Sequence, residues 1–598
     1  MAVLSAAACA SSPEAPIASS GQTAPNQQFD ELAEGYFEEL LALEPMLATS
    51  IGDNRYNDRF VPAFSEEQRE KSRALAVKTL AALGKVRRDA LDPKRTISYE
   101  MLTRELEEEL AGLRFPSHLA PVDQFRSFAN SFAQMGSGTG IHPFKTVKDY
   151  DDFLGRMGGF AAAVDIAIGN MRKGIQAGVV RPRVVMEKVL PQLSAQLATG
   201  VENSVFYQPI RNMPSSFSPA DRERLSTRYA AAIREQLLPA YQRLHDFIRD
   251  EYLPKTRESV GLSALPGGRA WYEHLVRQHT TTNLTPEQIH ALGLAEVARI
   301  HGEMEKVRQE VGFAGDLRAF LRHVASSRTF MFTSREEMLA EYRDTQTRID
   351  AATDKLFDLK PKANYEIRPV ESFRERSAAG GSYVPATPDG SRSGVFYLNT
   401  YEPTSRSKNA VEALLLHEGS PGHHFQISIQ REITSLPRFR RFGRYTVYSE
   451  GWALYAETVG KDLGFYTDRY RYLGALQSEL WRAIRLVLDT GLHTQGWSRE
   501  RAIEYGRQNS AGSDVQIVSE VERFIAIPGQ ALAYKIGQLK IAELRRKAER
   551  ALGPRFEIKA FHRAVLEDGA VPLDVLERKI DRWIAVRHEN RVSALTAP

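Results

Sequence analysis

The chain of 598 residues is 42% hydrophobic and 26% charged, which is the composition of a globular protein long enough for one or two domains. Its 79 basic and 75 acidic residues nearly cancel to a net charge of +4, which gives no electrostatic basis for binding nucleic acid. Beyond the N-terminal segment, no stretch of the sequence has the length and hydrophobicity of a transmembrane helix.

The N-terminal segment contains the only cysteine, Cys9, so the chain can form no internal disulfide. A short apolar run and three alanines precede Cys9, and a stretch rich in Ser, Pro and Ala follows it, which resembles the end of a bacterial lipoprotein signal. Ala6 departs from that pattern, because a larger aliphatic residue is usual at this position. We therefore expect a signal-like segment at residues 1–9 with Cys9 as the lipidated residue, a disordered tether at residues 10–27, and a periplasmic or envelope location. The alternative is an unstructured N-terminus with an incidental cysteine.

Most of the remaining chain is predicted to be helical. Apolar residues recur at helical spacing over residues 29–41, and similar stripes follow along the chain. The glycine-rich stretch at residues 116–142 is expected to be irregular, and it contains no phosphate-binding glycine motif. We expect an N-terminal helical region at residues 28–260 and a catalytic helical region at residues 261–598, which together form one integrated domain.

The periodicity changes in the middle of the chain. Two short strands are predicted at residues 365–368 and 394–399, separated by turns at Gly380-Gly381 and Pro388-Asp389-Gly390. The edge of such a sheet could hydrogen-bond an extended peptide substrate, and the alternative is a hairpin with a purely structural role. Tyr383, which lies between the two turns, is a candidate for contact with the site or its substrate.

Residues 409–430, NAVEALLLHEGSPGHHFQISIQ, are predicted to form a buried helix, because apolar residues cover most of its circumference. This apolar surface is interrupted by His417, Glu418, His423 and His424, and buried histidine and glutamate side chains require partners. A divalent metal ion is a suitable partner, since the spacing H-E-x-x-H on a helix brings together two zinc ligands and a general base.

That spacing is broken here by Pro421. On an unbroken helix His417 and His424 would share a face but lie about 10 Å apart, too far to bind one zinc ion at about 2 Å each. Pro421 removes a backbone hydrogen bond and must kink the helix, and Gly422 permits backbone angles that other residues resist. We therefore predict that these two residues act as an insertion that folds His423 back beside His417, and His423 is favoured over His424 as the ligand.

A catalytic zinc site needs a third protein ligand and an open position for water. Glu450, in the apparent helix YSEGWALYAE, is predicted to be that ligand, and Glu457, seven positions later on the same face, is placed to orient a ligand histidine. One zinc ion would then be held by His417, His423 and Glu450, with Glu418 as the general base. The alternative interpretation is that the histidines are satisfied core residues and that the glutamate caps a helix.

Residues further along the chain are candidates to complete the site. A zinc hydrolase needs a donor that stabilises the oxyanion, and the candidates are His493, after a Gly-Leu helix end, and Tyr534, after the break at Pro528-Gly529. Arg485 and Arg523 are candidates for binding a terminal carboxylate, which would make the enzyme a carboxypeptidase.

Four segments of the chain match the pattern of one bacterial family: HEGSPGHHFQ, YSEGWALYAE, LDTGLHTQGW and ERFIAIPGQALAYKIG. The chain resembles this family, the domain of unknown function 885, over nearly all of its length after the tether, and many members of the family are described as lipoproteins. The family is similar to helical gluzincin peptidases such as angiotensin-converting enzyme, thimet oligopeptidase and carboxypeptidase Taq. The resemblance therefore implies a mostly α fold with a deep channel and a zinc ion, and its motif is matched by His417, Glu418, His423 and Glu450.

We expect a mostly α zinc metallohydrolase, with a small β-sheet next to the metal-binding helix, that cleaves short peptides as a carboxypeptidase or an oligopeptidase. Zn²⁺ would activate a water molecule, and Glu418 would take its proton. One alternative is a zinc amidase or esterase with a non-peptide substrate, and another is a non-catalytic envelope lipoprotein that acts as a binding module. The expected partner is a short peptide or a small amide, the membrane is contacted only through the N-terminal lipid, and no oligomeric state is predicted.

Overall fold

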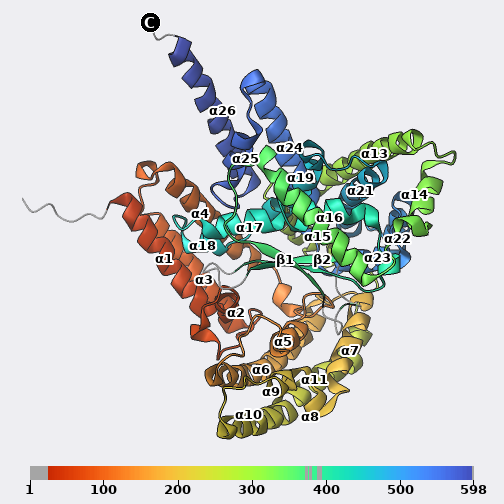
Figure 1. Cartoon of the computed structure of the whole chain (residues 1–598). Coiled ribbons are helices and arrows are strands. Elements are labelled where there is room, and N and C mark those ends of the chain that lie inside the picture. Colours follow the sequence, from red (N-terminus) through yellow and green to blue (C-terminus); the bar gives the residue numbers. More distant parts are fainter. Residues whose placement is uncertain (1–23, 371–374, 376–379, 387–392, 596–598) are drawn as a thin grey trace, which may run out of the picture.

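The structure is a computed structural model of the chain, and it describes residues 24–370, 375, 380–386 and 393–595. The predicted lipidation site, Cys9, and the predicted turn at residues 388–390 lie outside the described residues. Within the described residues, helices dominate and three strands form one small sheet near the centre of the molecule (Figure 1). The expectation of a mostly α chain with a small sheet is therefore confirmed. None of the described helices is both long enough and apolar enough to cross a membrane.

The chain begins with helices that pack on one another (red to orange in Figure 1). They are α1 (Pro25–Leu43), α2 (Pro45–Ser50), α3 (Glu66–Leu83) and α4 (Pro93–Gly112). Helix α1 starts inside the stretch expected to be a tether, because proline suits the first helical position and a buried apolar stripe begins at Phe29. That stripe consists of Phe29, Ala33, Phe37 and Leu41.

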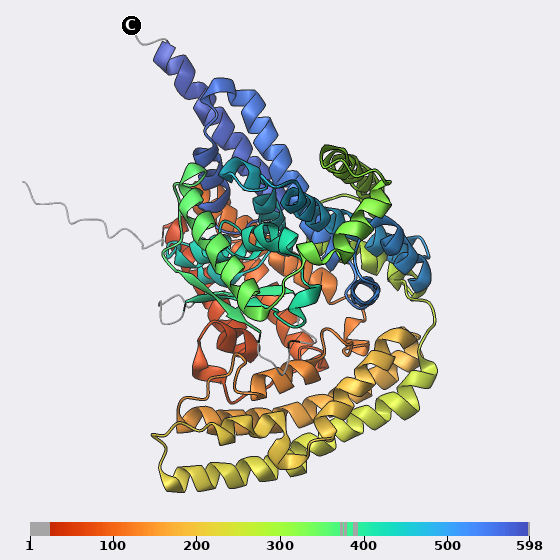
Figure 2. The same cartoon turned by 45° about the vertical axis from the view of Figure 1, so that its right-hand side comes forward.

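A curved layer of helices follows along the lower end of the molecule (orange to yellow in Figures 1 and 2). It contains α5 (Phe128–Gly136), α6 (Val147–Ala177), α7 (Arg183–Leu197), α8 (Gly200–Asn203), α9 (Gln208–Arg211), α10 (Pro219–Ala232) and α11 (Leu238–Asp246). Helix α5 contradicts the expectation of irregular structure at residues 116–142. Its Phe132 stacks on Phe160 and Phe153, with ring centroids 4.4 and 5.4 Å apart, so burial against α6 stabilises a helix that has no clear local signal.

The remaining helices form the upper part of the molecule (green to blue in Figure 1). They are α12 (Gly268–Thr280), α13 (Pro286–Glu310), α14 (Leu317–Ser326), α15 (Arg335–Ala352), α16 (Val411–Glu418), α17 (His423–Glu432), α18 (Arg438–Phe442), α19 (Thr446–Thr458), α20 (Gly460–Leu463), α21 (Arg469–Thr494), α22 (Arg499–Asn509), α23 (Asp514–Ala526), α24 (Ala533–Leu552), α25 (Ile558–Leu566) and α26 (Leu573–Leu595). Helix α13 packs along α21, and α19 packs along α24.

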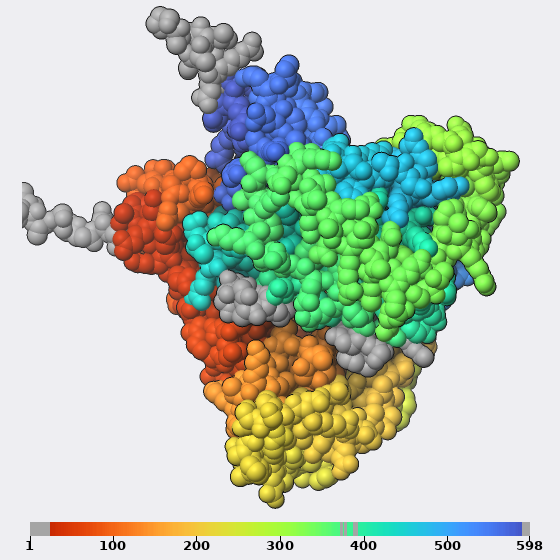
Figure 3. All heavy atoms as spheres, viewed as in Figure 1, coloured from red at the N-terminus to blue at the C-terminus, as the bar shows by residue number. Residues whose placement is uncertain are grey.

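Two hydrophobic cores hold these helices together. One core includes residues from Phe29 in α1 to Ile584 in α26, and the other includes residues from Val122 to Ala531. Both cores therefore join the N-terminal helices to the C-terminal ones, which lie directly against each other in the space-filling view (Figure 3). Helix α21 contributes to both, with Leu486 in the first core and Ile484 in the second, so it is a central element of the fold.

The sheet consists of β1 (Tyr365–Pro369), β2 (Gly381–Val384) and β3 (Gly394–Leu398) in the order β1-β3-β2. The predicted strands correspond to β1 and β3, which pair in parallel and therefore form no hairpin with each other. Strand β2 pairs antiparallel with β3 and lies at an edge of the sheet, where the sequence analysis expected a turn to begin. A strand of four residues carries too little alternation to be recognised, and its pairing with β3 decides its conformation.

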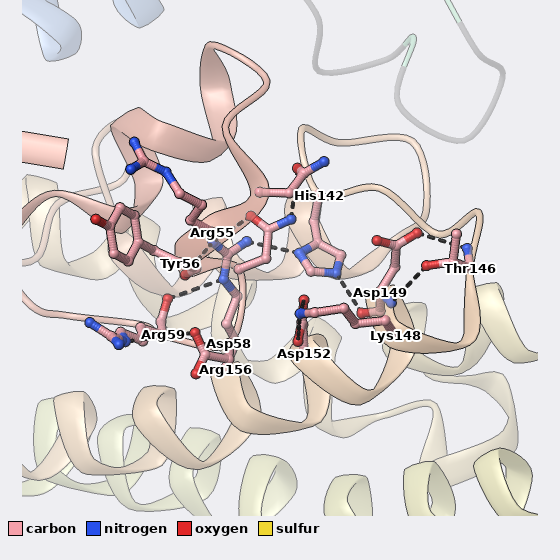
Figure 4. A network of polar contacts seen from close by, with 12 residues as sticks. Arg55, Tyr56, Asp58, Arg59, His142, Thr146, Lys148, Asp149, Asp152 and Arg156 are labelled. Carbon is pink, nitrogen blue, oxygen red and sulfur yellow. Dashed lines mark hydrogen bonds and ion pairs between the residues drawn. The ribbon is translucent and has the colours of Figure 1, made fainter. Parts of the chain in front are cut away.

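A buried arginine ties the segment after α2 to α6 (Figure 4). The side chain of Arg156 is 0% exposed, and it donates from Nη1 to Nδ1 of His142 at 2.8 Å and from Nε to the carbonyl oxygen of Arg59 at 3.1 Å. His142 donates in turn from Nε2 to the carbonyl oxygen of Asp149 at 2.8 Å, and burial lowers the pKa of His142 to about 4, so its ring is neutral. Every group in this network has a protein partner, so the network has a structural role and holds the segment after α2 against α6.

Helices α19 and α24 cross at a pair of glycines, Gly451 and Gly537. A Cβ atom added to Gly451 would lie 2.4 Å from Cα of Gly537, and one added to Gly537 would lie 2.0 Å from the carbonyl oxygen of Val447. Only glycine permits so close an approach. The crossing places α24 directly against the helix that carries Glu450.

The substitution Gly537→Ala should therefore lower the midpoint of thermal unfolding, because overpacking at such a contact costs about 1–3 kcal/mol. The control is Gly302→Ala in α13, where no atom lies within 4 Å of the added Cβ and alanine is the better helix former. Circular dichroism melts of both variants check this expectation. An unchanged midpoint for Gly537→Ala would show that the two helices can separate without cost.

Candidate metal centre

The predicted break in the histidine-rich helix is confirmed. Helix α16 ends at Glu418 and α17 begins at His423, with residues 419–422 between them. Gly422 makes the break tight, since a Cβ atom there would lie 2.0 Å from the carbonyl oxygen of His417. The bend brings the imidazole of His423 beside that of His417, with ring centroids 4.8 Å apart.

Helix α19 supports the bend. The indole Nε1 of Trp452 donates a 2.7 Å hydrogen bond to the carbonyl oxygen of Pro421. Trp452 is 0% exposed and lies two residues after Glu450, so the helix that supports the bend also carries the carboxylate that faces it. Trp452 is not among the site residues predicted from the sequence, although an indole on an apolar helix needs an acceptor for its N–H, which is a usable signal.

His417, His423 and Glu450 converge, and one ligand atom from each lies within 4.8 Å of the others. The Nε2 atoms of His417 and His423 lie 3.5 and 3.3 Å from Oε2 of Glu450. Ligand atoms bound tetrahedrally to one zinc ion at about 2.0–2.1 Å lie about 3.3 Å apart, so this spacing fits a metal better than it fits good hydrogen bonds. Oε2 of Glu450 is buried and has no hydrogen-bond partner of normal geometry among the described residues, which also fits an ion as its partner.

Glu457 lies behind His417, in keeping with the prediction that it would orient a ligand histidine. Its Oε1 is 2.8 Å from Nδ1 of His417, which directs Nε2 of the same ring toward Glu450. Glu457 is 3% exposed, and Nη2 of Arg482 in α21 lies 4.0 Å from the same oxygen. A carboxylate in this position fixes the tautomer and the ring orientation of a histidine ligand.

Carboxylates favour positive charge on the imidazoles of the group. Burial would lower the pKa of His417, but the nearby carboxylates of Glu450 and Glu457 outweigh it and raise this pKa to about 9. Burial would raise the pKa of Glu450, but the two nearby imidazoles hold it well below the usual value. A positive charge at the centre of the group is therefore stabilised.

Glu418 is the last residue of α16 and directly follows His417. It is 9% exposed, and its carboxylate forms no hydrogen bond or ion pair with any residue that the structure describes. A carboxylate beside the candidate metal ligands and without a competing partner is available to accept a proton.

His424 turns away from the converging group and is not part of it. Its Nδ1 lies 2.9 Å from the hydroxyl of Tyr383 in β2, and its ring centroid lies 4.5 Å from that of Tyr365 in β1. Burial lowers the pKa of His424 to about 4, so its ring is neutral. The geometry therefore agrees with the choice of His423 over His424, and it places Tyr383 against α17 through His424.

The prediction of His493 as an oxyanion donor needs correction. Nδ1 of His493 accepts a 2.9 Å hydrogen bond from the backbone N–H of Leu262, and Nε2 donates a 3.0 Å hydrogen bond to the carbonyl oxygen of Phe524. His493 is 0% exposed, and burial lowers its pKa to about 4. Both ring nitrogens are engaged with the backbone, so His493 joins α21 to its neighbours and has no donor left for a substrate.

The other predicted residues form one cluster. The guanidinium carbon of Arg485 lies 4.6 Å from the ring centroid of Tyr534, and Nη2 of Arg523 lies 3.4 Å from the hydroxyl of Tyr534. Glu520, which the sequence analysis did not identify, accepts hydrogen bonds from Arg485 at 2.8 Å and from Arg523 at 3.0 Å. The structure thus brings Tyr534, Arg485 and Arg523 together around one carboxylate.

Two solved structures are similar to nearly the whole chain. One, described as a putative lipoprotein from Colwellia psychrerythraea, is 28% identical with a TM-score of 0.88, and the match covers 94% of this chain and 99% of that one. The other, described as a putative lipoprotein of unknown function from Shewanella oneidensis, is 18% identical with a TM-score of 0.72, and the match covers 92% of this chain and 99% of that one. At 18% identity, the similarity to this second structure concerns the fold alone. No curated protein matches the chain.

The sequence model of one protein family, described as bacterial protein of unknown function (DUF885), matches residues 45–580. This range contains the converging histidines and glutamate as well as the arginine cluster. The match confirms the family resemblance that the motifs indicate. The chain belongs to the DUF885 family of bacterial proteins.

Proposed function

We propose that this protein is a zinc-dependent hydrolase that cleaves amide bonds in short peptides. The observation that carries the proposal is the convergence of His417, His423 and Glu450, with ligand atoms spaced 3.3 and 3.5 Å apart and the unpaired Glu418 beside them. Two histidines and a glutamate, with a fourth position left for water, are the donor set of catalytic zinc in thermolysin-like peptidases. A structural zinc site would need a fourth protein ligand, and the converging group has none among the described residues.

The residues of the chain have distinct tasks in this proposal. When bound, zinc would activate a water molecule and polarise the substrate carbonyl. Glu418 takes the proton of the attacking water and passes it to the leaving amine nitrogen. Glu457 holds the ring of His417 in the orientation that a ligand requires. Tyr534 is the proposed donor to the carbonyl oxygen that becomes negative during the attack.

The sheet supports a peptide substrate. Strand β2 lies at the sheet edge, and its Tyr383 contacts His424, the residue that follows the proposed ligand His423. A peptide added along β2 as a further strand would therefore pass close to the metal ligands. A deep channel, as in the helical gluzincin peptidases that the family resembles, is part of the proposal and would restrict substrates to short, flexible chains.

We also propose a location in the cell envelope. The two similar solved structures are described as putative lipoproteins, and Cys9 follows a short apolar run and three alanines. Lipidation of Cys9 would attach the folded body to a membrane through the segment before α1.

The substitution His423→Ala should abolish stoichiometric zinc binding, because it leaves two protein ligands where a zinc site requires three or four. His424→Ala is the matched control, since it removes the adjacent imidazole, which contacts Tyr383 instead of the converging group, and it should retain about one zinc per chain. Elemental analysis after dialysis against zinc measures both. The reverse result would show that the ligands are assigned incorrectly.

The substitution Glu418→Gln should keep the zinc but lower the rate of hydrolysis by about 10²–10⁴-fold, the usual contribution of a general base. Turnover is measured with panels of short peptides, acyl amides and esters on zinc-loaded protein. Cleavage of esters or non-peptide amides alone would favour the amidase or esterase alternative. Stoichiometric zinc without turnover of any panel would favour a binding module, and full activity in Glu418→Gln would remove this residue from the mechanism.

A further inference from the structure

We propose that Arg485, together with Arg523, binds the free carboxylate of the substrate, so that the protein cleaves peptides or N-acyl amino acids whose carboxyl terminus is unblocked. This inference rests on the proposed hydrolase function and specifies the substrate class of the same site. It is carried by three observations: unsatisfied hydrogen-bond donors, an imbalance of charge, and the position of the arginine cluster next to the converging metal ligands.

The first observation concerns the donors of Arg485. Arg485 is only 7% exposed, and its Nη2 donates to Oε2 of Glu520 at 2.8 Å. Nε and Nη1 are buried and have no hydrogen-bond partner among residues 24–370, 375, 380–386 and 393–595. A buried N–H of a charged group without an acceptor is costly, and native structures rarely retain one without a reason. Nη1 adjoins the paired Nη2, so an incoming carboxylate oxygen at Nη1 would satisfy one of these donors.

The second observation is the local charge. Glu520 is the only carboxylate that the described residues hydrogen-bond to Arg485, and it also accepts from Nη1 of Arg523 at 3.0 Å. The remaining contacts of the two arginines are neutral, with the ring of Tyr534 under Arg485 and the amide oxygen of Gln530 at 2.6 Å from Arg523. Two guanidinium groups thus share one carboxylate, and a second carboxylate would balance them.

A third arginine adds to this imbalance. Burial lowers the pKa of Arg126, the nearby Asp123 opposes this shift, and the positive charge of Arg523 lowers the pKa further. Arg126 belongs to the segment that precedes α5, so the N-terminal part of the chain also directs positive charge at the cluster. The side chain of Asp123 is engaged with the backbone N–H groups of Phe125 and Arg126, at 2.8 and 2.6 Å.

The third observation is position, and two paths through the structure agree on it. Along α21, Arg485 follows Arg482 by three residues and lies on the same helical face. Arg482 lies 4.0 Å from the carboxylate of Glu457, and that carboxylate contacts His417.

Along α24, Tyr534 lies about one turn before Gly537, which packs on Gly451 next to Glu450. The cluster is therefore adjacent to the converging group. An extended peptide advances about 3.3–3.6 Å per residue, so only a short stretch of chain can lie between the metal position and the cluster.

The test compares paired substrates that differ only at the carboxyl terminus, namely benzoyl-Gly-Phe and benzoyl-Gly-Phe-amide, on the zinc-loaded protein. We expect kcat/KM to be about 10- to 100-fold higher for the free acid, as is typical of a hydrogen-bonded charge pair in a buried site. Arg485→Gln should remove that preference by slowing hydrolysis of the free acid about 10- to 100-fold more than hydrolysis of the amide. Arg485→Lys, which keeps the charge but loses the planar donor group, should show an intermediate loss for the acid alone.

The control is Arg507→Gln. Arg507 also pairs with an acidic residue of α23, but with Asp514 at the surface, so its loss should change neither substrate. If wild-type protein cleaves acid and amide equally, or if Arg485→Gln and Arg485→Lys slow both equally, the arginine has only a structural role and the inference is overturned. Thermal melts of both Arg485 variants show whether either one has lost its fold. If Arg485→Gln has, the rates of acid and amide hydrolysis by Arg485→Lys decide whether the inference holds.

A binding measurement separates this inference from the proposed hydrolase function. Isothermal calorimetry with the dipeptide Gly-Phe and its amide, on the Glu418→Gln protein, should show tighter binding of the acid, and the combined Glu418→Gln and Arg485→Gln protein should lose the difference. Acid-selective binding that depends on Arg485 without any turnover would keep the carboxylate site and reject the hydrolase. Turnover without acid-selective binding would support the hydrolase and reject the carboxylate site.

Discussion

The approach of Gly422 to the carbonyl oxygen of His417 is the contact on which the candidate metal centre depends. With any side chain at this position the added Cβ would lie 2.0 Å from that oxygen, so α17 could not start where it does. Trp452 then holds the carbonyl of the preceding Pro421 from α19. The two contacts place the imidazole of His423 beside His417 and align both with a carboxylate on the supporting helix. The position of α19 depends in turn on the glycine crossing with α24, so this backbone contact also helps to position Glu450 in the converging group.

Buried charges elsewhere in this part of the molecule are matched. Lys535 is 0% exposed and pairs with Glu479 at 2.7 Å and with Glu296 at 2.9 Å, while Arg299 bonds the same two carboxylates at 2.6 and 2.8 Å. Such balance is what the cost of burying an ion demands. The converging histidine and glutamate residues, by contrast, leave Oε2 of Glu450 without a hydrogen-bond partner of normal geometry among the described residues, and two guanidinium groups of the arginine cluster share one carboxylate.

These two imbalances are complementary and lie next to each other. A metal ion would supply the missing positive charge at one group, and a substrate carboxylate would supply the missing negative charge at the other. The same residues would be difficult to explain as parts of a purely structural core, because an unpaired buried charge destabilises a fold. The proposed hydrolase activity and its proposed selectivity for a free carboxylate are thus both inferred from the distribution of buried charge in these two groups.

Where local patterns failed, the structure shows a tertiary cause. Helix α5 forms because Phe132 packs on the aromatic rings of α6, and β2 forms because β3 pairs with it. The imidazole of His493 could donate a hydrogen bond to a substrate, but both of its ring nitrogens already form hydrogen bonds with the backbone. Neither the partners of a side chain nor the pairing of a short strand can be read from residues adjacent in sequence.

The sequence by itself determined that the chain is mostly helical, that the helix carrying His417 must break at Pro421, and which family it belongs to. These conclusions depend on local properties: apolar periodicity, the missing N–H of proline, and motif spacing. Only the tertiary structure decided that Trp452 supports the bend, that Glu520 is shared by two arginines, and that this cluster lies close to the candidate metal ligands. The reason is physical, since these contacts join residues from α16, α19, α21, α23 and α24, and their distances are set by how the helices pack.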